Sequence, residues 1–598
     1  MNRILTIILL ALLASGCSSD KKEKVGKAKT ESQKAAQKLE KEKQRQEELQ
    51  AARLDEAKQN FIFDSEHVTF VIEQVFGKAW KKAFKDGDLE RMQTFFFPEF
   101  VGQTIENEKL SLKSASVVRE ETRIRGNGPK EVDVSGIVSY LGSVKKRFEK
   151  LNRLKFRVLK IAQPVAGQPI WECRILVDAV GESAPSKPYQ YESEQVVIFE
   201  IENEEEIDEK PVISDWKIEK EIFRSADQYL TEEVTSQVLL DKVQMPDNWK
   251  LSVDETEQYW FQYSVEDFNL DGKLDLAASS NHLYPRLYTN GVGSRFVEVA
   301  DSRNVVPAAG KARIGNSFGC AWLDYDNDGY PDLINGPILF KNMEGKSFQD
   351  VTNQSGLMFY AECMGIIVAD YDCDGLVDIY ALYQSPNIAE DPDAPKQWVN
   401  ETMTGAENQL WKNMGKGRFE NVTKKANAGG GKRHTHAANW FFYDDDHYPD
   451  LYIANDFGKN VLLRNKGDGT FEDVSLETKT EGYSTSMGVS TGDLDNDGRN
   501  EIYVANMYSK MGRRIIGQVN ETDYPEGIFE QIKGSCAGNR LYTRSEEGNE
   551  FKEIGETNGV HDVGWAFGPD FVDLDGDGLL DIYATTGFMS FRRDKPDG

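Results

Sequence analysis

The stretch DYDNDGYPDLINGPILFKNMEGKSFQDVT, residues 324–352, decides the fold of this chain. It opens with a loop of pattern D-x-[DN]-x-D-G-x-x-[DE] and continues through two strand-like runs separated by a Gly-containing turn. Carboxylates at positions 1, 3 and 5 lie on one side of such a loop, the Gly at position 6 permits φ > 0, and the acid at position 9 closes the cage. Calcium prefers all-oxygen ligand sets of this kind, so the stretch predicts a calcium-binding β-hairpin.

The loop recurs along the C-terminal part of the chain. Its six copies are DFNLDGKLD (Asp267–Asp275), DYDNDGYPD (Asp324–Asp332), DYDCDGLVD (Asp370–Asp378), FYDDDHYPD (Phe442–Asp450), DLDNDGRNE (Asp493–Glu501) and DLDGDGLLD (Asp573–Asp581). A second motif of strand, Gly/Asn turn and strand begins at Arg286, Ile338, Gln409, Val461 and Arg540. Four short strands every ~40–50 residues is the spacing of propeller blades.

Five of the loops carry predicted calcium ligands. These are Asp267, Asn269, Asp271 and Asp275; Asp324, Asp326, Asp328 and Asp332; Asp370, Asp372, Asp374 and Asp378; Asp493, Asp495, Asp497 and Glu501; and Asp573, Asp575, Asp577 and Asp581. The alternative is a plain Asx-stabilised turn, but five such like-charge clusters would be costly without a cation. In the fourth loop Phe442 replaces the first acid and His447 the Gly, so we expect weak or no calcium binding there.

The two alternating motifs resemble the FG-GAP/VCBS repeat of integrin-α-type β-propellers, from about Gln258 to the C-terminus. The stretch STSMGVSTGDLDNDGRNEIYVANMYSKMGRRI, residues 484–515, further resembles bacterial relatives of cartilage acidic protein. The resemblance implies a mainly β, calcium-stabilised propeller of six or seven blades, usually outside a membrane and usually a recognition module. Insertions fall near Ser385–Asn408 and Met507–Ala537.

The chain ends soon after the sixth loop, so we expect the last blade to lack its outer half. Either a strand within Val238–Ser252 closes the ring or the chain is a truncated product. The propeller domain is assigned to residues 236–598.

The N-terminus predicts an exported lipoprotein. Arg3 precedes an apolar run, Ile4–Leu13, and Ala14–Cys17 matches a lipobox, so residues 1–17 form a signal peptide and Cys17 becomes lipidated. Ser18 follows, and the absence of Asp at this position resembles lipoproteins sorted to the outer membrane of Gram-negative bacteria, which implies a place on its periplasmic or surface face. No later stretch reaches the ~18 apolar residues of a membrane-spanning helix.

Charge separates the next segment from the rest. The chain has a formal charge of -29, which argues against a nucleic-acid partner because phosphate contacts need clustered Lys and Arg. Basic residues gather instead in residues 18–60, which we interpret as a helical or disordered spacer. A coiled coil or a wall-binding segment is the alternative.

The order of helix-like and strand-like segments predicts a smaller α+β domain over residues 61–235. Apolar residues recur three and four apart over Val71–Phe96, and four long strand-like runs follow. Helix first and strands after resembles the nuclear-transport-factor/SnoaL-like cone, which implies a pocket that is catalytic, ligand-binding or filled. We find no convincing Asp/His pair in this domain, which favours a non-enzymatic role.

Cysteine, histidine and tryptophan residues of the repeats could have either a structural or a functional role. Cys320 and Cys363 take similar places before successive loops, so they are the one suggested disulfide. His434 and His436 could bind a metal at i, i+2, but no third ligand is evident and a structural role is favoured. Equivalent repeat positions are predicted for Trp322, Trp411, Trp440 and Trp565, so inter-blade packing is preferred over sugar platforms.

The function predicted from these features is that of a lipid-anchored, calcium-binding recognition or adhesion module for an extracytoplasmic protein or polysaccharide. The alternative is an enzyme, either a calcium-dependent polysaccharide-active propeller or a small-molecule enzyme or binder in the cone domain. A purely architectural envelope component is a third hypothesis.

Overall fold

The computed structural model describes residues 54–105, 111–114, 117–126, 130–240, 261–280, 285–305, 319–360, 363–384, 405–524, 527–545 and 548–587. The chain divides into two units, residues 1–60 with 520–529 and residues 61–519 with 530–598. In the smaller unit Lys58 pairs with Asp523. The predicted lipobox and Cys17 lie outside the described residues.

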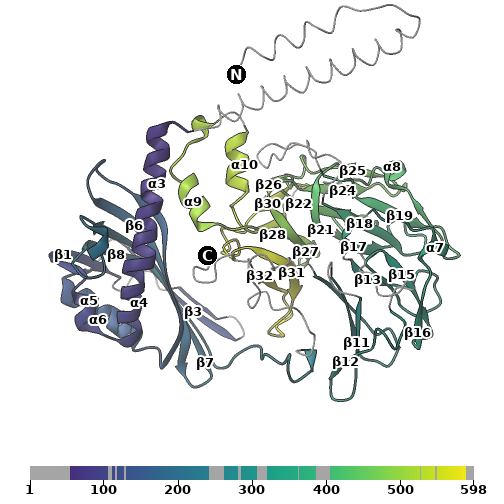
Figure 1. Ribbon diagram of the computed structural model, residues 1–598, viewed down its shortest axis with the longest axis horizontal. Coiled ribbons are helices and arrows are strands. Elements are labelled where there is room, and N and C mark those ends of the chain that lie inside the picture. Colours follow the sequence, from purple (N-terminus) through teal and green to yellow (C-terminus); the bar gives the residue numbers. More distant parts are fainter. Residues whose placement is uncertain are drawn as a thin grey trace, which may run out of the picture. The chain divides into compact units, whose positions relative to one another are not determined.

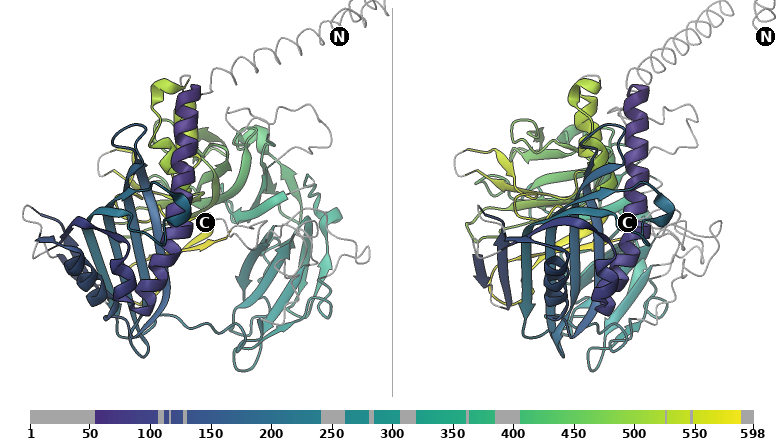
Figure 2. Two further views of the ribbon diagram at one scale, coloured as in Figure 1. Left: turned by 60° about the vertical axis from the view of Figure 1, so that its left-hand side comes forward. Right: turned by 90° about the vertical axis from the view of Figure 1, so that its left-hand side faces the viewer.

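The N-terminal region combines helices with one large sheet. Its helices are α3 (Glu56–Val71), a π-helical turn (Ile72–Phe76), α4 (Gly77–Asp86), α5 (Leu89–Gln93), α6 (Val134–Lys145) and a 3-10 turn (Glu204–Glu206). Its strands are β1 (Phe96–Thr104), β2 (Ser111–Ser114), β3 (Val118–Ile124), β4 (Lys130–Val132), β5 (Lys150–Ala162), β6 (Ile170–Ala184), β7 (Lys187–Glu200) and β8 (Ile213–Ala226). The sheet order is β2-β3-β8-β7-β6-β5, with β1 parallel to β8 and β4 paired to β1. Figure 2 shows this sheet and its helices in purple and blue.

The helical pattern over Val71–Phe96 breaks where the backbone needs a left-handed residue. Gly87, whose φ is 68°, caps the C-terminus of α4, and Asp88 caps α5 by accepting a hydrogen bond from the Arg91 N–H. The buried face of α4 carries Trp80, whose ring lies 6.0 Å from that of Trp216 on β8. This aromatic contact joins the helix layer to the sheet.

The C-terminal part consists of antiparallel sheets that follow one another in chain order (Figure 1). Five have four strands: β9 (Phe261–Glu266), β10 (Asp275–Ser280), β11 (Arg286–Asn290), β12 (Phe296–Glu298); β13 (Cys320–Leu323), β14 (Asp332–Asn335), β15 (Ile338–Met343), β16 (Ser347–Asp350); β17 (Cys363–Ala369), β18 (Asp378–Tyr383), β19 (Gln409–Asn413), β20 (Phe419–Asn421); β21 (His434–Phe441), β22 (Asp450–Asp456), β24 (Val461–Asn465), β25 (Phe471–Asp473); and β27 (Ser486–Gly492), β28 (Glu501–Asn506), β29 (Arg540–Arg544), β30 (Phe551–Glu553).

Two smaller sheets and several short helices complete this part. Strands β31 (Ala566–Val572) and β32 (Asp581–Thr586) form a two-stranded sheet, and β23 (Gly458–Lys459) pairs with β26 (Tyr483–Ser484). The helices are α7 (Thr352–Ser355), α8 (Thr423–Ala426), α9 (Lys510–Ile516), a 3-10 turn (Glu521–Asp523) and α10 (Ile528–Gly534). Within the described ranges, no helix combines the length and apolar character needed to cross a bilayer.

Each Asp-rich loop connects the first and second strands of its sheet, and the acid at position 9 is the first residue of the second strand. The prediction of loops inside β-hairpins is therefore confirmed. The first strands of successive sheets, β9, β13, β17, β21, β27 and β31, pack against one another in that order. Apolar clusters fill the space between neighbouring sheets, so each repeat buries its faces against the next.

The sixth loop belongs to a sheet with two strands among the described residues. The segment expected to close the ring, Val238–Ser252, lies mostly outside the described residues. Of its described part, the Val238 main-chain oxygen accepts a hydrogen bond from the Phe296 N–H on β12.

The suggested disulfide between Cys320 and Cys363 is wrong. Both thiols are free and buried, on β13 and β17. The Cys363 thiol donates to the Gly365 main-chain oxygen at 3.3 Å, and burial raises the pKa of both thiols. They behave as small core side chains.

Candidate metal centres

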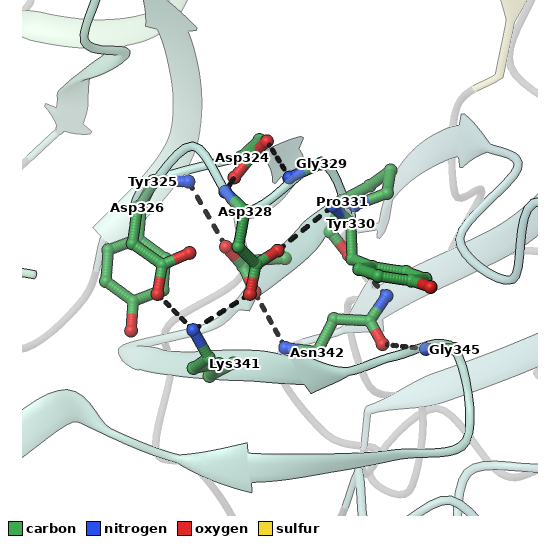
Figure 3. A network of polar contacts seen from close by, with 11 residues as sticks. Asp324, Tyr325, Asp326, Asp328, Gly329, Tyr330, Pro331, Lys341, Asn342 and Gly345 are labelled. Carbon is green, nitrogen blue, oxygen red and sulfur yellow. Dashed lines mark hydrogen bonds and ion pairs between the residues drawn. The ribbon is translucent and has the colours of Figure 1, made fainter.

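The second loop shows how an Asp-rich hairpin is built (Figure 3). Asp324 at position 1 accepts hydrogen bonds from the N–H groups of Asp328 (3.0 Å) and Gly329 (2.8 Å). Asp328 at position 5 accepts one from the Tyr330 N–H at 3.0 Å. These Asx-type bonds fix the two carboxylates on the inner side of the turn.

The turn requires left-handed backbone at positions 4 and 6. In the second loop Asn327 has φ 55° and Gly329 has φ 87°. The same pair of positive φ values occurs at Leu270 and Gly272, Cys373 and Gly375, Asn496 and Gly498, and Gly576 and Gly578. The predicted role of the position-6 Gly is thus confirmed in five loops. Position 4 also has a positive φ in these loops, but different residue types occupy it, so the sequence did not reveal this requirement.

The carboxylate at position 3 differs from its neighbours. Asp326 Oδ1 is buried and has no hydrogen-bond partner among the described residues, and the same holds for Asp372 Oδ1 in the third loop. Their second oxygens contact Lys341 and Lys412, respectively. A buried carboxylate oxygen beside two further acids is a group that a divalent cation satisfies, so these residues fit calcium.

Four loops bring three acids close enough to share an ion. The groups whose ligand atoms lie within 4.8 Å of one another are Asp324, Asp326 and Asp332; Asp370, Asp372 and Asp374; Asp493, Asp495 and Asp497; and Asp573, Asp575 and Asp577. The first loop has Asn269 at position 3, whose Nδ2 donates to Asp275 Oδ2 at 3.2 Å. Its predicted ligand set is therefore less acidic than the other four.

The acid at position 9 has a second role that the sequence did not reveal. Asp332 is buried and accepts hydrogen bonds from the N–H groups of Asn342 on β15 (2.7 Å) and Tyr325 (3.1 Å). Burial raises the pKa of its carboxyl to about 7, against the opposing effect of these two N–H donors. Asp378 and Asp450 make the same two contacts and have pKa values raised for the same reason to about 7. Position 9 thus anchors the third strand to the loop.

The fourth loop departs from this geometry, as its sequence suggested. Neither Asp445 nor His447 has a positive φ. Asp444 Oδ2 accepts a hydrogen bond from Arg464 Nε at 2.7 Å, and Asp444 is largely buried. A guanidinium therefore balances the charge at position 3 of this loop.

Successive repeats are linked through Asn side chains that were not predicted from the sequence to have this role. The Nδ2 groups of Asn342, Asn413 and Asn465 donate to the main-chain oxygens at position 2 of the preceding loop, those of Phe268, Tyr325 and Tyr371. Loops also touch directly: Asn327 Nδ2 donates to the Gly375 oxygen and Asn496 Nδ2 to the Gly578 oxygen, both at 2.9 Å. The signal was present in the sequence as an Asn at or next to the end of each of these third strands.

The side chains of His436, Trp322 and Trp411 are largely buried. His436 on β21 lies 2.6 Å from Gln384 and 3.7 Å from Asp456. Trp322 stacks on Phe268 of the preceding repeat at 5.8 Å, which is the predicted inter-repeat packing. The predicted equivalence of the four Trp positions is wrong, because Trp322 and Trp440 lie on first strands, Trp411 on a third strand and Trp565 before β31.

A fully buried acid of the N-terminal region was not predicted from the sequence. Glu221 on β8 has no exposed surface, and its carboxylate accepts hydrogen bonds from the hydroxyls of Tyr191 (2.7 Å) and Tyr140. Burial raises the pKa of Glu221, while the two hydroxyl donors oppose the shift. Both oxygens are satisfied within the core, which favours a structural role.

Comparison with known proteins agrees with the repeat geometry. A model of the FG-GAP-like repeat matches residues 267–334 and 443–504, which contain the first, second and fifth loops and most of the fourth. The chain contains FG-GAP-like repeats. It is 27% identical to cartilage acidic protein 1 of Xenopus tropicalis over 172 residues, 23% of this chain and 26% of that protein, and 26% identical over 171 residues to that of Homo sapiens. The match thus spans about a quarter of the length of these relatives.

Proposed function

We propose that the FG-GAP-like repeats form a calcium-stabilised β-propeller that recognises a protein or polysaccharide outside the cytoplasm. The observation that carries the proposal is the set of Asp-rich hairpins, each placing several carboxylates at one end of its sheet, two of them with an orphaned buried oxygen. FG-GAP-like repeats and the similarity to cartilage acidic protein 1 favour an extracellular binding or adhesion module.

Calcium in this proposal has a structural task. The predicted ligands of the first, second, third, fifth and sixth loops would hold the ion, which supplies the positive charge that offsets their mutual repulsion. An ion that binds only the folded chain stabilises it by ~4 kcal/mol when its free concentration is a thousandfold above the dissociation constant.

Recognition is assigned to the other end of the sheets. The Asp-rich loops join first to second strands, so the connections from second to third strands lie at the opposite strand ends. One of these connections holds Phe457, which has φ 47° and is 41% exposed. A bulky residue held in left-handed backbone with its ring exposed is a feature typical of ligand-contacting positions.

The segments that precede the repeats anchor them to the envelope and hold them away from it. Cys17 anchors the chain in the envelope through its lipid, residues 18–60 act as a spacer, and the N-terminal region is a filled cone without catalytic function. The aromatic core around Trp80 and the satisfied carboxylate of Glu221 support the last point.

The test compares two variants of the full chain in binding to envelope proteins and extracellular glycans with calcium present. Phe457→Gly removes the exposed ring at a position where Gly is favoured, so binding should fall while the melting temperature does not. The control Val292→Ala alters a residue that is 92% exposed in the turn between β11 and β12, at the Asp-loop end. Equal ligand retention by Phe457→Gly and wild type, or turnover of a glycan, would refute recognition by this face.

A further inference from the structure

One position of the third strand faces the Asp-rich loop in every four-stranded repeat. Strand pairing places this residue opposite the position-9 acid, as Lys341 lies opposite Asp332. The five equivalent residues are Thr289, Lys341, Lys412, Arg464 and Thr543. Three repeats thus place a cationic side chain at this position and two place a threonine.

The two lysines lie on the carboxylates that calcium would need. Lys341 Nζ contacts Asp326 and lies 3.0 Å from Asp328, the acids at positions 3 and 5 (Figure 3). In the third loop Lys412 Nζ contacts Asp372 and lies 2.9 Å from Asp374. An ammonium group at this point reduces the repulsion between the two carboxylates, which is the same repulsion that a bound calcium ion would reduce.

The fifth loop has a different partner. Thr543 Oγ1 donates to Glu501 Oε1 at 3.1 Å, so the third strand supplies a neutral hydroxyl there. Asp493, Asp495 and Asp497 still converge within 4.8 Å. The loop keeps the left-handed backbone of the second and third loops at Asn496 and Gly498. The fifth loop thus differs from those two loops in its facing side chain, and in having Glu501 where they have Asp at position 9.

We infer that Lys341 and Lys412 are tethered counter-ions that occupy the second and third loops without calcium and must leave their carboxylates before calcium binds. This inference rests on the proposed calcium sites. The fifth loop, facing Thr543, forms a tighter class of site, and the second and third loops a weaker one. The lysine side chains are 25% and 22% exposed, so their ammonium groups can move to solvent on flexible stems.

The experiment is a calcium titration of the full chain by isothermal calorimetry, with melting temperatures measured in EDTA. Replacing either lysine with Gln should strengthen calcium binding at its loop about fivefold, as expected for a partly exposed ion pair, and lower the melting temperature in EDTA. Thr543→Lys should do the reverse, weakening the tight class and raising the melting temperature in EDTA. If a lysine variant fails to fold, Thr543→Lys still tests the inference.

Two outcomes separate this inference from the function on which it rests. Calcium binding that shows one affinity class, unchanged in all three variants, overturns the tethered counter-ions and leaves the calcium sites standing. Absence of calcium binding in wild type and in Lys341→Gln overturns both. Two affinity classes that shift as described support both.

Discussion

Asn413 Nδ2 donates a hydrogen bond to the Tyr325 main-chain oxygen, 2.8 Å away in the Asp-rich loop of the preceding repeat. The main-chain N–H of Asn413 also donates to Asp378 Oδ1 in its own loop at 2.7 Å. One buried residue therefore joins two successive loops, and the conformation of each hairpin depends on its neighbour.

Replacing Asn413 with Ala should lower the free energy of unfolding by ~1–3 kcal/mol, because buried polar groups lose their partner. Urea denaturation measures this change. Asn290 is the matched control: it takes the equivalent place in the first repeat, and its buried Oδ1 has no partner among the described residues. A cost for Asn290→Ala equal to that of Asn413→Ala would contradict the coupling.

Asp326→Ala should reduce the rise in melting temperature that calcium produces, because the orphaned position-3 ligand is removed. Asp444→Ala should leave that rise unchanged, since Asp444 is already paired with Arg464. Scanning fluorimetry with calcium and with EDTA gives both values. Identical losses in the two variants would show that the fourth loop binds calcium like the second.

The carboxyl of Asp456 gives a pH dependence outside the Asp-rich loops. Burial raises its pKa to about 7, and burial lowers the pKa of His436, 3.7 Å away, to about 4. A raised folded pKa means that this acid stabilises the fold when protonated, so its contribution is full below pH ~4 and is lost as pH rises through about 7.

Asp456→Asn should therefore raise the melting temperature relative to wild type more at pH 8 than at pH 5. His436 titrates in both proteins, so its effect cancels in this comparison to first order. A difference that is the same at both pH values would contradict the raised pKa of Asp456.

The ion pair between Arg514 and Glu66 predicts a large stability effect far from the loops. Arg514 Nη2 lies 2.7 Å from Glu66 Oε2, its Nη1 donates to the Val158 oxygen, and its side chain is 7% exposed. Glu66→Gln should cost roughly 3 kcal/mol, because it leaves a buried charge unpaired, whereas the double variant Glu66→Leu, Arg514→Met should recover most of it. Denaturant melts compare the two variants, and a double variant that is destabilised at least as much as Glu66→Gln would refute the pairing.

Much of the repeat part follows from the sequence because its turn chemistry is local. The Asp and Gly positions dictate the hairpin, and the fourth loop's Phe442 and His447 indicate its different backbone. The break after α4 could also have been predicted, since Gly87-Asp88 is a C-cap followed by an N-cap.

Features that depend on contacts between distant residues could not be predicted from the sequence. A bulge in β8 at Glu219 shifts the alternation, so that Glu221 and not Lys220 is buried. Cys320 and Cys363 occupy equivalent strands, but equivalence along a repeat does not place two thiols at bonding distance. The Lys341 contacts depend on strand register, which the sequence pattern alone left open.

The most direct test measures bound calcium and thermal stability on the same sample. Elemental analysis of the purified chain should find several calcium ions, and calorimetry after EDTA treatment should show a sharply lower melting temperature that added calcium restores. A chain without bound calcium whose melting curve is the same with and without EDTA would contradict the account.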